Sequence, residues 1–398
     1  MTNDGMIPAL ADLSQDIAGP IPVGLVQDWV ASARDAGAHE RILAPYVRVG
    51  TIVCSDSAGL SKLSVGKPLV EVMKLVSEPK EVIFSHGRAI GGEAVGTWIA
   101  DNTQMFYDAS IPSETVVSQM IAAQRAMSGL TVKVGIGIHH GTVYEIGGGL
   151  YGTDADDIEG FTEEETKGGE VAVSASVRAA IGAAIPTKEE RAGKHILDFE
   201  KHAAEASASD DVFYPAPFPK AFHEAVRSLD AGDPAAVEAL HRAYAKRTVI
   251  ILARVFDAPH DQLLDLLVAR TAAGAVIRRV AAQLGVEVLE ATGGVVLLHV
   301  PEADKAASFA RELIVALRAG GFAGNVGLCE GEVLMFDRGN GNWNVAGAAV
   351  NISSKLAEDT PERGVIFFES SVAHAAGPDA VPFSIVKSGV TIAGVCCR

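Results

Sequence analysis

Two aspartates lie where the chain turns after strand-like runs. Asp56 follows the apolar stretch 47–54, and Asp101 lies in a predicted hairpin. Carboxylate oxygens are hard ligands, which suit Mg²⁺ or Mn²⁺. Each aspartate also fits an ordinary strand-end or turn position, where aspartate is common. If the fold brings the two carboxylates together, divalent-metal binding is the first chemistry that they could perform.

A second polar pair lies far downstream. Asn351 and Lys355 are one helical turn apart in a predicted helix over 349–357, so their side chains share a face. Asn351 could instead be the N-cap of that helix, and Lys355 a solvated charge. Between the two pairs, the segment 154–165 holds seven carboxylates and is predicted to be a solvated acidic loop.

These residues fall within a pattern of elements that occurs twice. An internal repeat is stronger evidence for the fold than any single motif. The first copy is predicted to contain elements at 47–54, 60–76 (helix), 81–84, 96–107, 114–127 (helix), 131–139, 171–174 and 211–214. The second copy is predicted to contain elements at 248–255, 262–284 (helix), 286–291, 295–300, 303–319 (helix), 325–329, 333–336, 349–357 (helix), 364–369, 383–386 and 391–395. Both orders predict an α+β fold with helices on a mostly antiparallel sheet.

Three motifs of the first copy resemble the class III adenylate and guanylate cyclases. They are SDSAGLS at 55–61, WIADN at 98–102 and IGIHHGTV at 136–143. The first resembles the family's strand ending in Asp-x-x-Gly-Phe-Thr, the second its Lys-Thr-Ile-Gly-Asp hairpin, and the third its Ile-Gly-Ile-His-x-Gly-x-Val turn. Their order and spacing are those of the family.

The second copy resembles the family through a different subset of motifs. VGLCEGEV at 326–333 repeats the strand and turn, and GAAVNISSKL at 347–356 resembles the family's Gly-x-x-Val-Asn-x-Ala-x-Arg-Met helix start. The two metal-aspartate positions fall on Arg254 and Gly294, so this copy lacks the metal ligands. In the first copy the helix start falls on residues 156–161, which lack the transition-state groups.

The losses of the two copies are therefore complementary. A class III cyclase site lies at a dimer interface, with metal aspartates from one subunit and base- and transition-state-binding groups from the other. The resemblance implies two ferredoxin-like cyclase domains paired head-to-tail within one chain, as in the cytosolic domains of animal membrane adenylate cyclases. One composite site would then need no further oligomeric partner.

The resemblance also assigns roles to individual residues. Asp56 and Asp101 would bind Mg²⁺ or Mn²⁺, Asn351 would orient the ribose, and Lys355 would take the role of the family arginine. Lys387 could reach the triphosphate, or be a solvated hairpin lysine.

Two further positions would read the base. The family's adenine-reading lysine aligns with Glu290 and its partner with Asn344, and guanylate cyclases carry Glu at the first position. Leu150 is the residue of the first copy predicted to match Asn344. The other explanation for Glu290 and Asn344 is that the pocket no longer binds a base and its residues have changed without selection.

Composition and charge limit the number of domains and the kinds of partner that the chain can have. Hydrophobic residues make up 48% and charged residues 21% of 398 residues, which fits a folded chain of two or three domains. We expect an N-terminal extension (1–45), two cyclase-like domains (46–216 and 247–398) and a helical linker (217–246). The net charge of −17 argues against nucleic-acid or anionic-membrane partners. With no secretory pattern and no apolar run of ~20 residues, we expect a cytoplasmic protein without a membrane span.

Two functions remain open from the sequence. The first is a nucleotide cyclase that converts GTP or ATP, with GTP favoured, into the cyclic nucleotide. The second is a degenerate nucleotide-binding or regulatory scaffold. The metal aspartates and Asn351 favour the enzyme, whereas Lys355, the altered base pocket and Gly135, where many family members have a phosphate-binding arginine, favour the scaffold.

Overall fold

The computed structural model describes residues 21–58, 67–98, 101–200, 202, 207–256, 260, 262–292, 294–339, 342–387 and 390–398. Contacts divide the chain into two units. The first unit is Leu43–Leu229, and the second combines Met1–Ile42 with Asp230–Arg398. Each unit contains one copy of the sequence repeat.

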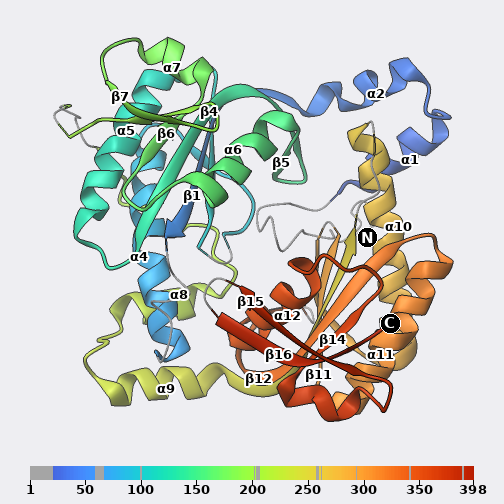
Figure 1. Cartoon of the computed structure of the whole chain (residues 1–398). Coiled ribbons are helices and arrows are strands. Elements are labelled where there is room, and N and C mark those ends of the chain that lie inside the picture. The colour runs from blue at the N-terminus through green and yellow to red at the C-terminus, as the bar shows by residue number, and fades with distance from the viewer. Residues whose placement is uncertain are drawn as a thin grey trace. The chain divides into compact units, whose positions relative to one another are not determined.

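The first unit is built on one mixed sheet with the strand order β2-β3-β1-β4-β6-β8-β7, and β5 pairs with β4 (Figure 1). Its strands are β1 (Val47–Ala58), β2 (Glu93–Ala94), β3 (Thr103–Asp108), β4 (Lys133–Ile146), β5 (Gly149–Tyr151), β6 (Val171–Val173), β7 (Thr187–Arg191) and β8 (Lys194–Leu197). Its helices are η1 (Ala44–Tyr46), α4 (Leu69–Ala89), α5 (Ser113–Ala126), η2 (Met127–Gly129), α6 (Thr153–Glu165), α7 (Ala175–Ile181) and α8 (Lys220–Ser228).

The second unit repeats this sheet with the order β10-β11-β9-β12-β14-β16-β15, and β13 pairs with β12. Its strands are β9 (Ala245–Phe256), β10 (Glu287–Thr292), β11 (Val295–Val300), β12 (Ala323–Gly339), β13 (Asn342–Ala346), β14 (Ile366–Glu369), β15 (Val381–Lys387) and β16 (Val390–Cys397). Its helices are α9 (Pro234–Tyr244), α10 (Leu263–Leu284), α11 (Ala303–Ala319), α12 (Ala348–Glu358) and η3 (Ser370–Ala375), together with α1 (Val23–Ala31) and α2 (Ala36–Leu43), whose last residue lies in the first unit.

Each sheet is covered on both faces. In the first unit, α4, α5 and α7 pack on one face through a core of aliphatic and aromatic side chains, and α6 packs on the other face (Figure 1). In the second unit, α10 and α11 cover one face, and α12 covers the other. The central strands β1 and β9 are buried along six consecutive residues, and successive side chains point alternately into the two helical layers. The predicted α+β fold and its repetition are therefore confirmed.

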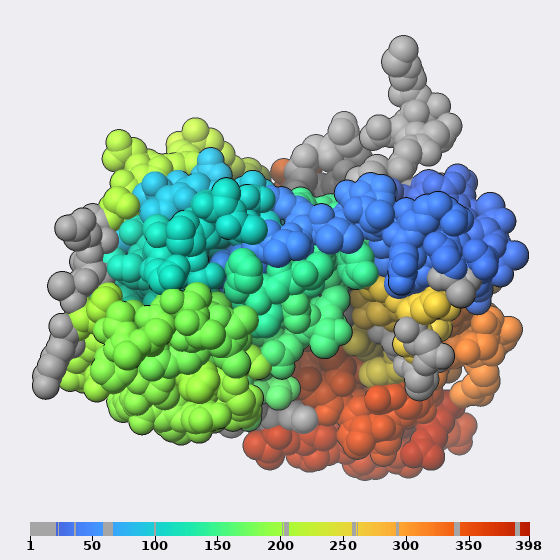
Figure 2. All heavy atoms as spheres, turned by 90° about the horizontal axis from the view of Figure 1, so that it is seen from above, coloured from blue at the N-terminus to red at the C-terminus, as the bar shows by residue number. Residues whose placement is uncertain are grey.

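The segment before β1 packs on a distant part of the chain. The Trp29 side chain is fully buried, and its Nε1 donates to Asp265 Oδ1 on α10 at 2.9 Å. Arg34 Nη1 lies 3.3 Å from the same oxygen. Figure 2 shows this blue segment lying over the yellow start of α10. The indole hydrogen bond ties α1 to a helix of the second copy rather than to the strand that follows it.

Three predicted elements of the first copy are wrong. The run 81–84, predicted as a strand, lies inside α4, because Ile83 and Phe84 share a buried helical stripe with Val70 and Ser77. The acidic loop is the helix α6, whose Ala155, Ile158, Phe161 and Thr162 are buried while most of its carboxylates point outward. The last strands are β7 and β8, not a strand at 211–214.

The residues predicted as a helical linker form two helices. α8 packs on α4 within the first unit, and α9 contacts β12 within the second. Asp233 caps α9 by accepting from the backbone N–H groups of Ala235 and Ala236. In the part of the chain that the structure describes, no helix is both long and apolar enough to cross a membrane.

Candidate functional site

The predicted metal aspartates of the first unit lie at the same end of neighbouring strands. Asp56 is near the end of β1, and Asp101 comes two residues before β3. The strands are held in register there by Ser55 opposite Thr103, whose hydroxyls are 2.6 Å apart. Ser57 Oγ donates a hydrogen bond to the Asp101 carboxylate. The sheet therefore brings the two carboxylates together, although metal binding by them stays a prediction.

The electrostatics of this pair are unfavourable without a cation. Burial, followed by the negative charges of Asp101 and Glu163, raises the pKa of Asp56 to about 8. Carboxylates that repel one another in a partly buried place are the environment that a divalent cation stabilises. The donor set, two aspartate carboxylates of hard oxygen, fits Mg²⁺ or Mn²⁺.

Glu163 is a neighbour that the sequence analysis missed. It lies on α6, and its Oε1 accepts from Asn102 Nδ2 at 2.6 Å, beside Asp101. Within the described ranges, no group of three or more His, Cys, Asp or Glu side chains is arranged to hold a metal. The negative charge of Glu163 contributes to the raised pKa of Asp56. A signal existed in the repeat, because Glu163 follows Gly152 by the same interval at which Glu358 follows Gly347.

The strand register gives the matching positions of the second unit. Asp56 faces Gly135 on β4, and Arg254 faces Asn325 on β12, one residue before the parallel pairing of each strand begins. Arg254 therefore occupies the position of Asp56. Its Nη1 lies 3.9 Å from Glu358 Oε1, and these side chains are 17% and 9% exposed. The second unit therefore has a mostly buried guanidinium at the position where the first unit has the carboxylate of Asp56.

The second metal position of this unit is closed by the backbone. A Cβ built on Gly294 would lie 2.5 Å from the Val255 carbonyl oxygen, which is a steric conflict. The Val255 N–H also donates to the Gly294 carbonyl at 2.6 Å. A side chain at Gly294 would therefore require the hairpin between β10 and β11 to shift.

The Arg254–Glu358 pair leads to a stability prediction. Arg254→Met should lower the free energy of unfolding by about 1–3 kcal/mol, because it leaves a mostly buried carboxylate without its cation. Arg254→Met combined with Glu358→Gln should recover part of the loss. Urea unfolding measures both variants. The exposed pair Arg242–Glu238, with side chains 76% and 60% exposed, gives the control Arg242→Met, which should cost about 0.5 kcal/mol or less. Equal losses of unfolding free energy in Arg254→Met and Arg242→Met would show that the Arg254–Glu358 pair stabilises the protein no more than an exposed pair does.

Asn351 and Lys355 lie within α12, one turn apart. The helix begins after Gly347, so Asn351 is its fourth residue, and the N-cap interpretation of Asn351 is wrong. Asn351 is exposed and Lys355 is half-buried. Because α6 begins after Gly152 in the same way, the corresponding residues of the first unit are Asp156 and Gly160, one position earlier than the motif alignment predicted. The first unit thus carries neither an amide nor a cation at these positions.

The predicted base-reading residues lie on two strands that contact each other, β10 and β13. Glu290 pairs with Leu297 after a bulge in β10. Asn344 is 4% exposed and pairs with Phe336 on β12. In the first unit, Ile146 pairs with Gly149, so Gly149 rather than Leu150 matches Asn344. A glycine there offers no side-chain hydrogen bond. Lys387 ends β15, and its side chain lies outside the described part of the chain.

Comparison with known proteins identifies the fold. No family model and no curated protein matches the sequence. Among solved structures, the chain is similar to a class III adenylyl cyclase-like ATP-binding protein from Pseudomonas aeruginosa, with 12% identity and a TM-score of 0.52 over 83% of this chain and 85% of that one. It also matches the guanylyl cyclase Cya2 (19% identity, TM-score 0.33, 38% of this chain and 93% of that one). The adenylyl cyclase CyaB from P. aeruginosa matches with 18% identity and a TM-score of 0.34, over 39% of this chain and 97% of that one.

The class of structure follows from the first of these matches together with the two sheets. The chain has the class III nucleotidyl cyclase fold, and two homologous mixed sheets of this kind occur in tandem within it.

Proposed function

We propose that this protein is a metal-dependent nucleotide cyclase that forms a cyclic nucleotide from a nucleoside triphosphate at one composite site. In this proposal the first unit supplies the metal-binding residues Asp56 and Asp101. The second unit supplies Asn351 and Lys355 for the ribose and phosphate and Glu290 and Asn344 for the base. Guanine is the favoured base.

The observation that carries the proposal is the complementary distribution of these groups. The first unit keeps two adjacent carboxylates but has Asp156 and Gly160 on α6. The second unit has Arg254 in the place of Asp56, paired with Glu358, but keeps Asn351 and Lys355 on α12. Together the two units thus retain one complete set of these groups.

The residues account for the steps that a cyclisation requires. A divalent cation bound by Asp56 and Asp101 would lower the pKa of the ribose 3′-hydroxyl and offset the charge of the triphosphate. The Asn351 amide can hold the ribose by hydrogen bonds, and the Lys355 ammonium can stabilise the negative charge that develops at the α-phosphate. Pyrophosphate is the leaving group when the 3′-oxygen bonds to the α-phosphorus.

A non-catalytic nucleotide-binding scaffold is the second candidate, and specific residues favour it. Lys355 lacks the planar fork with which arginine contacts phosphate. Gly135 has no room for a longer side chain, since a Cβ there would lie 2.2 Å from Thr166 Oγ1. The structurally similar P. aeruginosa protein is described as an adenylyl cyclase-like ATP-binding protein. Such a scaffold would bind a nucleotide without converting it.

A turnover assay separates the two candidates. The purified protein is incubated with Mn²⁺ and either GTP or ATP, and cyclic nucleotide and pyrophosphate are quantified. We expect both products in equal amounts. Nucleotide binding without either product would support the scaffold, and the absence of binding as well would contradict both candidates.

Lys355 provides a further test of the enzyme. Lys355→Ala should lower kcat by about 10- to 100-fold with a smaller change in KM, because its charge is needed most where negative charge develops. Lys355→Arg should retain or raise kcat, because it restores a planar cation. Steady-state kinetics with saturating Mn²⁺ measures both. An alanine variant with wild-type kcat would show that Lys355 is a solvated helix charge.

A further inference from the structure

A lysine of the first unit is buried beside the hairpin that carries Asp101. Lys80 lies on α4, the residue is 2% exposed, and its Nζ donates to the Trp98 carbonyl at 3.0 Å. The same Nζ lies 5.7 Å from the centre of the Tyr214 ring. Fully buried lysines are rare and require compensation, which the carbonyl and the ring face both contribute to here. Because burying the Lys80 ammonium group costs free energy, we expect its hydrogen bond to hold the Trp98 backbone in place.

The residue that Lys80 contacts is held from several directions. Trp98 is fully buried, and its Nε1 lies 3.2 Å from the carbonyl oxygens of both Val95 and Gln104. Its ring stacks on Tyr214 with centroids 5.5 Å apart at 18°. Its backbone N–H donates to the Pro215 carbonyl at 2.9 Å. Trp98 is therefore an anchor at which α4 and the segment 214–215 meet the sheet.

This anchor is close in sequence to the metal aspartate. Asp101 follows Trp98 by three residues, so the chain limits their Cα atoms to a separation of roughly 10–11 Å. On the other side, Thr103 is fixed by its pairing with Ser55 in β1. Asp101 is therefore flanked by two fixed points of the chain, and Lys80 contacts the one that precedes it.

The aromatic partner of Trp98 links this anchor to the end of the first unit. The Tyr214 hydroxyl donates to Ser77 Oγ on α4 at 2.9 Å. The Tyr214 ring also meets the ring of His223, on α8, edge-on at 5.0 Å. Tyr214 and Pro215, which follow the last strand of the first sheet, thus contact Trp98 as Lys80 does.

We propose that Lys80 is a positioning residue for Asp101. Its ammonium group, acting through the Trp98 carbonyl, sets the start of the hairpin so that the Asp101 carboxylate faces Asp56. Tyr214 and Pro215 share this task, so the segment that leads out of the first unit also bears on the metal site. This inference rests on the proposed function, because it assumes that Asp56 and Asp101 bind a divalent cation.

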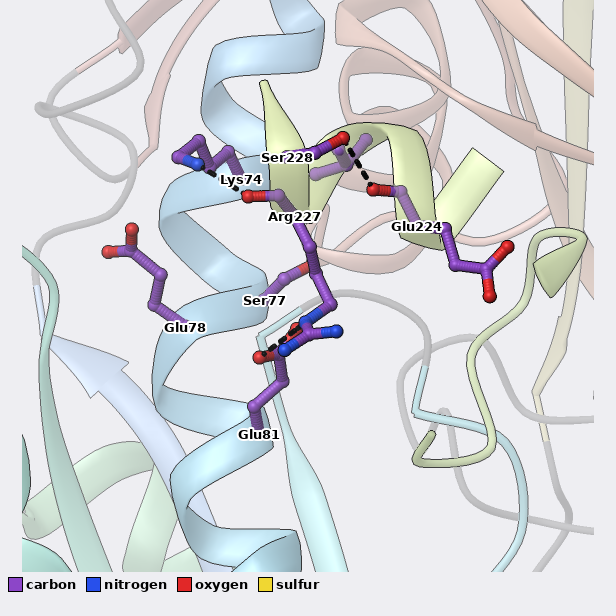
Figure 3. A pocket seen from close by; sticks show the side chains of 8 residues that line it. Lys74, Ser77, Glu78, Glu81, Glu224, Arg227 and Ser228 are labelled. Carbon is purple, nitrogen blue, oxygen red and sulfur yellow. Dashed lines mark hydrogen bonds and ion pairs between the residues drawn. The ribbon is translucent and has the colours of Figure 1, made fainter. Parts of the chain in front are cut away.

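A matched control lies on the same helix. Lys74 Nζ also donates to a backbone carbonyl, that of Arg227, at 2.9 Å. Lys74 lines an open cavity of about 450 Å³ between α4 and α8, together with Ser77, Glu81 and Arg227 (Figure 3). Lys74 therefore shares the helix, the residue type and the kind of acceptor with Lys80, but its hydrogen bond is exposed and does not reach the hairpin.

The experiment compares Lys80→Met with Lys74→Met in the full-length protein. Mn²⁺ binding is followed through the paramagnetic resonance signal of the unbound ion, and melting temperatures are recorded in parallel. Lys80→Met should weaken Mn²⁺ binding by about 10-fold or more, as is typical when a group that orients a metal ligand is removed. Lys74→Met should stay within about twofold of the wild type. Lys80→Arg, which keeps a cationic donor, should recover at least part of the affinity.

The outcomes separate this inference from the function on which it rests. A wild type that binds no Mn²⁺ would contradict the metal site itself. A wild type that binds, with a folded Lys80→Met variant of equal affinity, would contradict the positioning role alone. A lower melting temperature with unchanged affinity would mean that Lys80 only stabilises the fold. If Lys80→Met does not fold, Tyr214→Leu replaces it, since it removes the ring that stacks on Trp98, and unchanged Mn²⁺ affinity there would overturn the proposal.

Discussion

Asp101→Ala is expected to abolish Mn²⁺-dependent nucleotide binding and to lower turnover by about 100-fold or more. The variant removes one of the two carboxylates that the sheet brings together, and with it the acceptor of the Ser57 hydroxyl. Metal stabilisation of a phosphoryl transition state amounts to several kcal/mol, and each 1.4 kcal/mol is about tenfold in rate. Nucleotide titration with and without Mn²⁺, followed by the turnover assay, measures the effect.

A control for this variant comes from the other end of the same strand. Asp108 ends β3, where its carboxylate accepts from the Ser110 N–H in a turn. Asp108→Ala should leave Mn²⁺-dependent binding within about twofold, because that turn is remote from Asp56 along the strand. Asp101→Asn preserves the shape of the side chain and should behave like the alanine variant, since the amide lacks the negative charge. Wild-type binding in both Asp101 variants would remove the metal site from the proposal.

GTP is expected to bind more tightly than ATP by roughly ten- to a hundredfold. An ionised glutamate only accepts hydrogen bonds. Guanine presents N1–H and its 2-amino group as adjacent donors, which Glu290 can accept, whereas adenine presents N1 as an acceptor. A buried polar group left unpaired costs ~1–3 kcal/mol, which corresponds to that ratio of affinities. Asn344 can donate to guanine O6 or accept from adenine N6, so it adds little discrimination.

Glu290→Lys is therefore expected to erode the preference for GTP. Both nucleotides are titrated with Mn²⁺ on the wild type and on the variant. Glu287→Lys is the matched control, because Glu287 starts the same strand and is directed to His299, with its side chain 48% exposed. It should leave the preference unchanged. Equal affinities for GTP and ATP in the wild type, or a preference for ATP, would show that Glu290 does not read the base and would favour the scaffold.

The repeat and the fold class could be predicted from the sequence because their signals are local. Continuous apolar runs specify strands such as β1 and β9, and the two glycines before α6 and α12 begin equivalent helices. The short run 81–84 was assigned wrongly because β-branched apolar residues fit a strand and a buried helix equally well over four positions. Only the packing of α4 on the sheet distinguishes them.

The candidate site divides in the same way between sequence and structure. The motifs named Asp56, Asp101, Asn351 and Lys355, because each lies in a short segment with a recognisable spacing. They could not show that Glu163 adds its charge to Asp56, because this interaction joins a helix and a strand whose residues are more than a hundred positions apart.

The sequence by itself thus determined which residue types are available, in which order, and on which kind of element. Only the tertiary structure decided which of them share an environment: the Arg254 cation beside Glu358, and the buried Lys80 ammonium at the Trp98 carbonyl. The physical reason is that charge interactions, burial and steric exclusion depend on distance in space. Neither the composition nor the periodicity of one segment carries information about a partner brought close by folding.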